Sequence, residues 1–382
     1  MQEPEALPLL LRFRDTLLWA TTERADRHAL FRSEPGELPT AHPLAAPLKT
    51  LNSVVTAPDR TEARKVAHAC VEISEWAALN GFTATEYLFA WLAARTVEFD
   101  PEFAFAAGRA ARRQGRFDDA RSLFRRAIAL SRRAGDEAGY ANAYLGWAIM
   151  EEKRGNLPAA RSRFIRALRA ARRGGLPELV AATRHNMIAL AFAERNLQEG
   201  QAHIVSAYKL YGPDNPQLYR LANDAAGLWT IFGFYSIALP LYEHALPHVT
   251  RLDERVAILA NISRAAAGLG HRDRFLSAWT EATKLDRHAG ESLPDIYMEL
   301  ARGAHLLGYL IRAQELALEA IAAASARGSE EKRKAAAQLL DYIREGRPAP
   351  DHAEQPPPDV SRFALRFGKR LRRLDRTSGG HS

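Results

Sequence analysis

Two histidines lie one helical turn apart in the segment Glu-His-Ala-Leu-Pro-His, which comes nearest to a metal-binding motif in this sequence. His244 and His248 have the spacing of two zinc ligands on one helix face. A metalloprotease helix also needs a glutamate between such ligands as general base. Here Glu243 precedes the first histidine, and Pro247 distorts the turn that would hold the second. We therefore predict two surface histidines and no metal.

No other arrangement of side chains marks a catalytic or cofactor site. The single cysteine, Cys70, cannot form an internal disulfide, and we expect it to fill a small buried apolar position. Residues 268–271 have the pattern of a helix end and a turn, which is not a loop that cradles phosphates. Serines and histidines are scattered without pairing a nucleophile with a base. We therefore predict no enzyme and no cofactor.

The residues that a binding function would use must be positioned by helices, and the clearest pair of helices spans residues 100–133. Asp100 is a good N-cap residue, and Pro101 follows where a missing amide proton costs nothing. Apolar residues then recur with a helical period up to Gly115, which suits a helix end because glycine adopts positive φ easily. A second amphipathic run begins at Phe117. The segment predicts a helical hairpin.

Variants of this hairpin recur along the chain. Gly108 and Ala120 are small, so the two helix backbones can approach closely, and small residues stand at matching positions in most later units. The bend between helices falls at positions 81, 115, 155, 195, 233, 270 and 308, with spacings of 34 to 40 residues. Repetition at such a period indicates a solenoid, in which each unit packs on its neighbours.

The pattern resembles the tetratricopeptide repeat (TPR). That family has small residues at positions 8 and 20, glycine or a similar residue at 15, an aromatic at 24 and alanine at 27. The corresponding residues here are Gly108, Ala120, Gly115, Phe124 and Ala127. The longer spacings are similar to the extended repeats of bacterial signal-peptide receptors and of some transcription activators. The resemblance covers residues 60–345 and implies an all-α fold, a right-handed α-α superhelix of about seven helical hairpins.

We expect four parts along the chain. They are an N-terminal helical extension over residues 1–57, a TPR-like solenoid with a C-terminal capping helix over 58–345, a proline-rich linker over 346–359 and a basic amphipathic tail over 360–382. The extension should contain helices at 5–31 and 44–56. Pro240 and Pro247 lie in the second helix of one hairpin, where they predict a kink or an early end.

The resemblance also implies a binding groove. In a TPR superhelix the first helices line the concave side, and side chains at positions 6 and 9 are among those that point into it. The corresponding residues are Asn186, Asp224 and Asn261 at position 6, and Arg109, Arg264 and Arg302 at position 9. Amides one repeat apart could hydrogen-bond an extended peptide, and arginines beside them could pair with carboxylates. The alternative is a solvated surface whose asparagines make local helix contacts.

Basic residues are concentrated in two places. Residues 109–173 hold 17 Lys and Arg against 6 Asp and Glu, a net charge of +11, and the tail from Asp359 holds 7 against 2. The basic segment could contact nucleic acid electrostatically. However, its arginines share helices with acidic residues such as Asp118 and Glu151, and no nucleic-acid-binding module is evident. A solvated charged face is the favoured interpretation, so a nucleic-acid partner is not expected.

The tail and the N-terminus bear on location and partners. The tail has three interpretations: a disordered end, a helix bound by a partner or by an acidic membrane surface, and a segment folded back on the protein. At the N-terminus, Glu3 and Glu5 precede a short apolar run that Arg12 and Arg14 interrupt, which is no signal peptide. No apolar stretch is long enough to span a bilayer. We expect a cytoplasmic protein.

The predicted fold and the lack of a catalytic motif in the sequence together suggest a class of function. We predict a non-catalytic scaffold that binds a protein or peptide partner in the concave groove of a TPR solenoid. One alternative is a regulatory protein that responds to a ligand or peptide by changing the pitch of its superhelix. The less favoured alternative is an electrostatic nucleic-acid binder.

Overall fold

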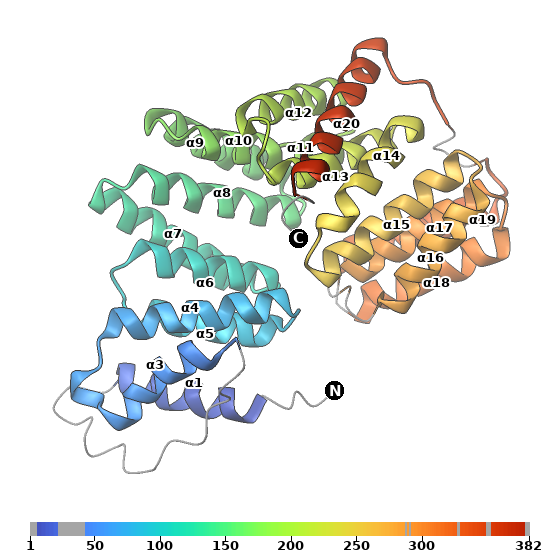
Figure 1. The fold of residues 1–382 in the computed structure, drawn as a ribbon. Helices are drawn as coiled ribbons and strands as arrows, with labels where there is room; N and C mark the ends of the chain where they lie inside the picture. The colour runs from blue at the N-terminus through green and yellow to red at the C-terminus, as the bar shows by residue number, and fades with distance from the viewer. Residues whose placement is uncertain are drawn as a thin grey trace. The chain divides into compact units, whose positions relative to one another are not determined.

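The fold was analysed in a computed structural model that describes residues 6–21, 43–286, 289, 292–326, 329–348 and 353–378. All regular secondary structure in these residues is helical. The chain divides into two compact units, Met1–Leu179 and Val180–Ser382, which we call unit 1 and unit 2 (Figure 1). Among the described helices, none is both long enough and apolar enough to cross a membrane.

Unit 1 consists of an N-terminal extension and consecutive helical hairpins. The extension contains α1 (Ala6–Thr21), α3 (Ala45–Thr56) and the 3₁₀ turn η2 (Pro58–Arg60). The hairpins pair α4 (Ala63–Leu79) with α5 (Thr83–Thr96), α6 (Pro101–Arg113) with α7 (Phe117–Ala134), and α8 (Glu137–Lys153) with α9 (Leu157–Arg173). The predicted helix at 44–56 is confirmed, whereas residues 22–31 of the other lie outside the described residues.

Unit 2 continues the same arrangement and adds two C-terminal helices. Its hairpins pair α10 (Pro177–Asn186) and α11 (Ile188–Ala193) with α12 (Leu197–Tyr211), α13 (Gln217–Thr230) with α14 (Tyr235–Ala245), α15 (Leu252–Gly268) with α16 (Arg272–Lys284), and α17 (Leu293–Leu306) with α18 (Leu310–Ala326). The last two helices are α19 (Glu330–Arg344) and α20 (Pro358–Ser378). The boundary between the units falls within α10.

The bends between paired helices lie where the sequence predicts them. All seven bend residues have positive φ: Gly81 (79°), Gly115 (75°), Gly155 (74°), Arg195 (49°), Gly233 (75°), Gly270 (73°) and Gly308 (77°). Arg195 is the only described non-glycine residue with positive φ. Its guanidinium donates to the carbonyl oxygen of Ile231 at 2.9 Å. The hairpins of the predicted all-α TPR fold are therefore confirmed.

Small residues in unit 1 pack against one aromatic ring. Phe124 is fully buried, and a Cβ added at Gly108 or Gly146 would lie 2.8 or 2.6 Å from its ring. These separations are shorter than carbon atoms tolerate, so glycine is required at both places if the ring is not to move. The close approach of α6 and α7 thus involves a predicted small position, Gly108, whereas Gly146 in α8 was not predicted.

The second helix of the α13–α14 hairpin ends early, as expected. Pro240 is accommodated inside α14, which stops at Ala245. A 3₁₀ turn, η3 (Leu246–His248), follows and contains Pro247. The missing amide protons of proline explain why the α-helix does not continue through this segment.

Candidate binding surfaces

Two of the predicted groove arginines meet on a glutamate that the sequence analysis did not single out. Arg264 of α15 is buried, and its guanidinium donates to Glu299 of α17 at 2.6 Å. Arg302 forms an ion pair with the same carboxylate. Burial alone raises the pKa of Glu299, but the charges of the two arginines outweigh it and hold the pKa below its ordinary value. The two positive charges are thus partly neutralised within the protein.

Asp224 of α13, another predicted groove residue, contacts a histidine of α10. Its carboxylate lies 2.9 Å from Nε2 of His185 and accepts a hydrogen bond from the amide of Asn223 at 3.0 Å. Desolvation raises the pKa of Asp224, but these contacts and the charges of His185 and Arg220 lower it further than burial raises it. Asp224 therefore stays ionised near neutral pH and serves at least partly to hold α10 and α13 together.

The remaining predicted groove residues differ in their availability. The amide of Asn186 donates to the carbonyl oxygen of Ala182 in its own helix at 2.8 Å, which is the local use that the alternative interpretation expects. Asn261 on α15 is half-buried, and its side chain makes no hydrogen bond to any described residue. In unit 1, the guanidinium of Arg109 lies over the ring of Phe105, and burial lowers its pKa.

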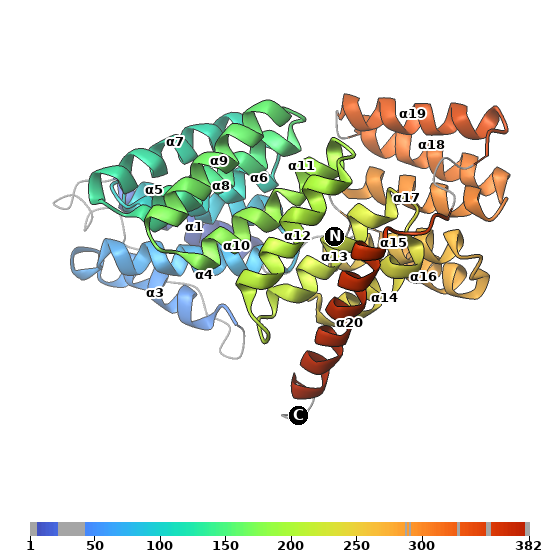
Figure 2. The ribbon, with the colours of Figure 1, turned by 90° about the horizontal axis from the view of Figure 1, so that it is seen from above.

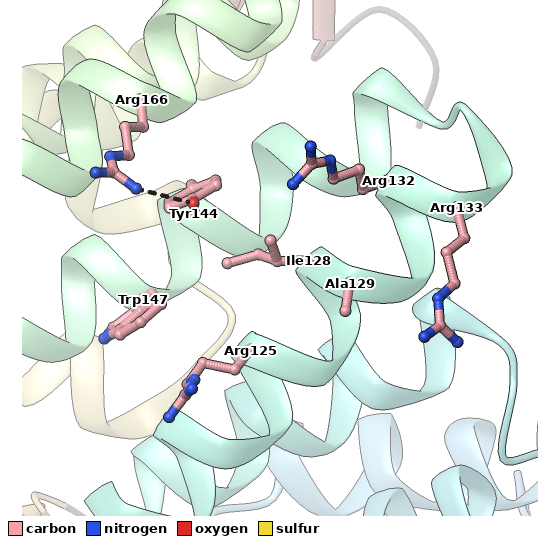
Figure 3. A pocket seen from close by; sticks show the side chains of 8 residues that line it. All are labelled: Arg125, Ile128, Ala129, Arg132, Arg133, Tyr144, Trp147 and Arg166. Carbon is pink, nitrogen blue, oxygen red and sulfur yellow. Dashed lines mark hydrogen bonds between the residues drawn. The ribbon is translucent and has the colours of Figure 1, made fainter.

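A second candidate surface lies in unit 1 and does not include Arg109, the groove residue predicted there. We call it the α7–α9 pocket; its volume is about 650 Å³, and it is lined by Arg125, Ile128, Ala129, Arg132, Arg133, Tyr144, Trp147 and Arg166. Helix α7 supplies five of these residues, α8 supplies the two aromatic rings, and α9 supplies Arg166. Figure 3 shows Arg132 and Arg166 on either side of Tyr144.

The aromatic side chains of the α7–α9 pocket are held in place by neighbouring groups. Tyr144 and Trp147 are stacked one turn apart, with ring planes inclined by 11° and centroids 6.3 Å apart. The indole N–H of Trp147 donates to Glu151 at 2.8 Å, and the guanidinium of Arg163 lies 4.2 Å from the centre of its ring. The pocket therefore has a fixed, flat apolar wall.

Electrostatics make the α7–α9 pocket strongly basic. Arg166 donates to the phenol oxygen of Tyr144 at 3.2 Å. Burial raises the pKa of Tyr144, but this hydrogen bond, a second one with Tyr140 and the charges of Arg166 and Arg163 outweigh burial and lower the pKa below its ordinary value. Among the residues that the structure describes, no carboxylate lies within 4.0 Å of any arginine that lines the pocket. The sequence signal was present only as the +11 charge of residues 109–173, which does not reveal that the arginines surround two aromatic rings.

The C-terminal tail folds back as a helix on unit 2, which was one of its three predicted interpretations. Six apolar residues of α20 are buried: Val360, Phe363, Ala364, Phe367, Leu371 and Leu374. The ring of Tyr208 on α12 packs edge-on against Phe363 and Phe367, and Arg370 lies over its face. Both ribbon views place α20 beside α14 (Figures 1 and 2). Since its apolar face is covered, the docked helix presents mainly cations to solvent.

The two histidines of the Glu-His-Ala-Leu-Pro-His segment contact the tail. Asp375 of α20 lies 3.1 Å from Nδ1 of His244 and 3.0 Å from Nε2 of His248, and the hydroxyl of Tyr219 donates to it at 2.9 Å. Both histidines lie at the surface, as expected, with His244 half-buried and His248 exposed, and both contact Asp375 of α20. Within the described residues, no group of three or more histidine, cysteine or acidic side chains is placed to hold a metal ion.

Comparison with known proteins agrees with this architecture. Residues 104–173, which span α6 to α9, match the model of the tetratricopeptide repeat family. No curated protein matches the chain significantly. Residues 104–173 therefore belong to the tetratricopeptide repeat family, and the other described helices form an all-α fold of paired helices around them.

The solved structures that resemble this chain are only distantly related to it in sequence. One is a signal transduction ATPase with numerous domains (STAND) from Pyrococcus horikoshii, which has a tetratricopeptide repeat sensor. It is 11% identical, with a TM-score of 0.52 over 96% of this chain, and this chain spans 57% of that protein. Another is a Rap protein complexed with competence and sporulation factor, 11% identical, with a TM-score of 0.39 over 89% of this chain and 98% of that one.

Proposed function

We propose that this protein is a non-catalytic scaffold that binds a peptide or protein segment. The observation that carries the proposal is the row of first helices in unit 2, where α15 packs between α13 and α17 and polar side chains stand about one repeat apart. The fold supports the proposal, because stacked hairpins form extended binding surfaces whose side chains are set by packing. We call α13, α15 and α17 the first-helix row.

Within the first-helix row, Asn261 and Arg302 are the best placed to contact a partner. An asparagine amide has both donors and an acceptor, so it can hydrogen-bond both polar groups of an extended peptide backbone. The amide of Asn261 is not used by any described residue. Arg302 is half-buried, and the guanidinium nitrogens that do not face Glu299 can pair with a carboxylate. Arg264 serves chiefly to fix Glu299.

The proposal can be tested by selecting peptides from a random library against the full chain and measuring the affinity of variants. Asn261→Ala should weaken binding by about 1 kcal/mol, roughly fivefold, because a hydrogen bond to the peptide is lost. Asn186→Ala is the matched control; its amide already bonds its own helix, so it should change affinity less. Circular dichroism should show the same helicity for both. Unchanged affinity in Asn261→Ala together with Arg302→Gln would rule out the first-helix row.

An alternative function is electrostatic binding of nucleic acid, and the exposed face of α20 is the observation that favours it. Its exposed cations have no carboxylate partner among the described residues: Arg362, Arg366, Lys369, Arg372, Arg373 and Arg376. A salt titration distinguishes the two functions, because phosphate binding weakens steeply as counterions compete. The other alternative, a ligand-responsive regulator, requires a change in solution scattering when a selected peptide binds.

A further inference from the structure

We propose that the α7–α9 pocket binds an acidic segment of a protein partner, one in which carboxylates flank an aromatic or aliphatic side chain. This inference rests on the proposed scaffold function and adds a second site to it, in unit 1. The carboxylates would pair with the arginines, while the apolar side chain would lie against Tyr144 and Trp147.

The first argument is charge. Four guanidinium groups line a single hollow, and no described carboxylate neutralises them. Each guanidinium carries five N–H donors. Arg166 donates one of its five to the phenol oxygen of Tyr144. All four arginines are exposed, so water screens their mutual repulsion, and an anion bound among them would be attracted by several positive charges at once. A carboxylate accepts two parallel hydrogen bonds from one guanidinium, which gives orientation as well as attraction.

The second argument is shape and apolar surface. The pocket has room for a few side chains, and its volume lies in the usual range for ligand pockets. Tyr144 and Trp147 form one wall, and Ile128 and Ala129 form part of another. Because Glu151 and Arg163 hold the indole ring, little ordering is needed when a ligand arrives. A ligand with charged groups only would leave this apolar wall exposed to solvent.

The arrangement favours a protein segment over nucleic acid. Single strands are bound by grooves in which cations follow the backbone and successive bases stack on successive rings. Here the cations surround one pair of rings, and Arg163 already lies over the ring of Trp147. A short segment with its charges gathered around one apolar residue fits this arrangement, in which the arginines surround a single pair of rings, better than a continuous phosphate chain.

The experiment measures fluorescence anisotropy of a labelled peptide, Glu-Glu-Phe-Glu-Glu-Leu-Glu-Glu, with the full chain at low and physiological salt. Arg132→Gln with Arg166→Gln should weaken binding by about tenfold or more, because two charge-assisted contacts are lost. Arg132→Lys with Arg166→Lys should retain part of the affinity that the glutamine variants lose, because lysine has the positive charge of arginine but lacks its planar guanidinium group. The matched control is Arg169→Gln with Arg172→Gln, which removes the same charge from exposed residues that do not line the pocket. It should stay within about twofold.

Several outcomes would overturn the inference. Equal losses in the pocket and control variants would show attraction to net charge alone. Equal affinity for an all-glutamate peptide would show that the aromatic wall is not used. If an oligonucleotide displaced the labelled peptide at a lower concentration than the unlabelled peptide does, and if this displacement depended on the same arginines, the ligand of the pocket would be nucleic acid and not a protein segment. Library peptides that respond to Asn261→Ala but not to the pocket variant would reject this site and leave the scaffold function standing.

Discussion

At the scale of single residues, side-chain volume decides how closely the helices of unit 1 approach. Phe124 fills the space that Gly108 and Gly146 leave, and all three lie in the buried interior of the repeats. Glycine inside a helix costs about 0.5–1 kcal/mol relative to alanine, so its presence at these positions needs a packing reason. The ring contacts provide that reason.

Gly108→Ala should destabilise the protein by about 1–3 kcal/mol, because the new methyl group would push the ring of Phe124 out of a filled core. Gly227→Ala in α13 is the control. Its added Cβ would meet only the hydroxyl of Tyr242 at 3.8 Å, so this change should be neutral or stabilise by up to about 1 kcal/mol. Denaturant unfolding of both variants provides the measurement. Equal stability of the two would contradict the packing argument.

Residue spacing predicted which helices carry the proposed groove residues, but not which side chains these residues contact. The spacing from the glycine bends correctly placed Arg264 and Arg302 on first helices of successive hairpins. It did not reveal that both bond Glu299, although that glutamate stands one turn before Arg302 and could have been recognised as an i,i+3 partner. The pairing of Asp224 with His185 needed coordinates, because it depends on how α10 packs on α13.

At the scale of elements, the local sequence predicts each helix, but it does not always predict which other helices that helix packs against. The charge pattern of α20 predicted a basic amphipathic helix, and the helix is there. Its position depends on Asp375 reaching Tyr219, which is 156 residues earlier in the chain. No periodicity in the sequence encodes so distant a contact. The α7–α9 pocket was missed for a similar reason, because three helices must be placed before its arginines surround the rings.

The contacts of Asp375 make the docking of α20 sensitive to acid. Burial raises the pKa of Asp375, but the hydrogen bonds from Tyr219 and His248 and the contact with His244 outweigh burial and lower it below the ordinary value of 3.8. A carboxyl group whose pKa is lower in the folded state stabilises that state above its ordinary pKa. This stabilisation is lost as the pH falls through the lowered value.

Asp375→Asn should therefore loosen α20 at neutral pH, because the ionic part of these contacts is removed. Amide hydrogen exchange in α20 should speed up by about threefold to tenfold, while exchange in α15 to α18 stays as it was. Lys369→Gln, an exposed change on the same helix, is the control and should have little effect. If α20 exchanged at the same rate in the Asn variant, the side chains around Asp375 would not hold the tail.

At the scale of the whole molecule, the repeats make most contacts between neighbours in sequence. Within each unit, a hairpin packs mainly on the hairpins before and after it, and the boundary between the two units falls within α10. The hairpin series was predictable because it follows from a local period. The division into two units was not predictable, because it depends on where neighbouring helices pack less extensively than elsewhere in the series. In such proteins stability is approximately a sum of repeat and nearest-neighbour contributions, so damage should stay local.

Ala160→Leu tests this locality. Ala160 is completely buried in α9, five residues after the bend at Gly155, and a leucine there should overpack the hairpin by about 1–3 kcal/mol. Hydrogen exchange monitored by mass spectrometry should then rise in α7, α8 and α9, whereas α15, α16, α17 and α18 in unit 2 should keep their protection. Ser162→Ala, an exposed change two residues further along α9, is the control and should leave both units unchanged. A uniform rise through both units would mean that the chain unfolds as one cooperative body, and the additive description of its repeats would have to be abandoned.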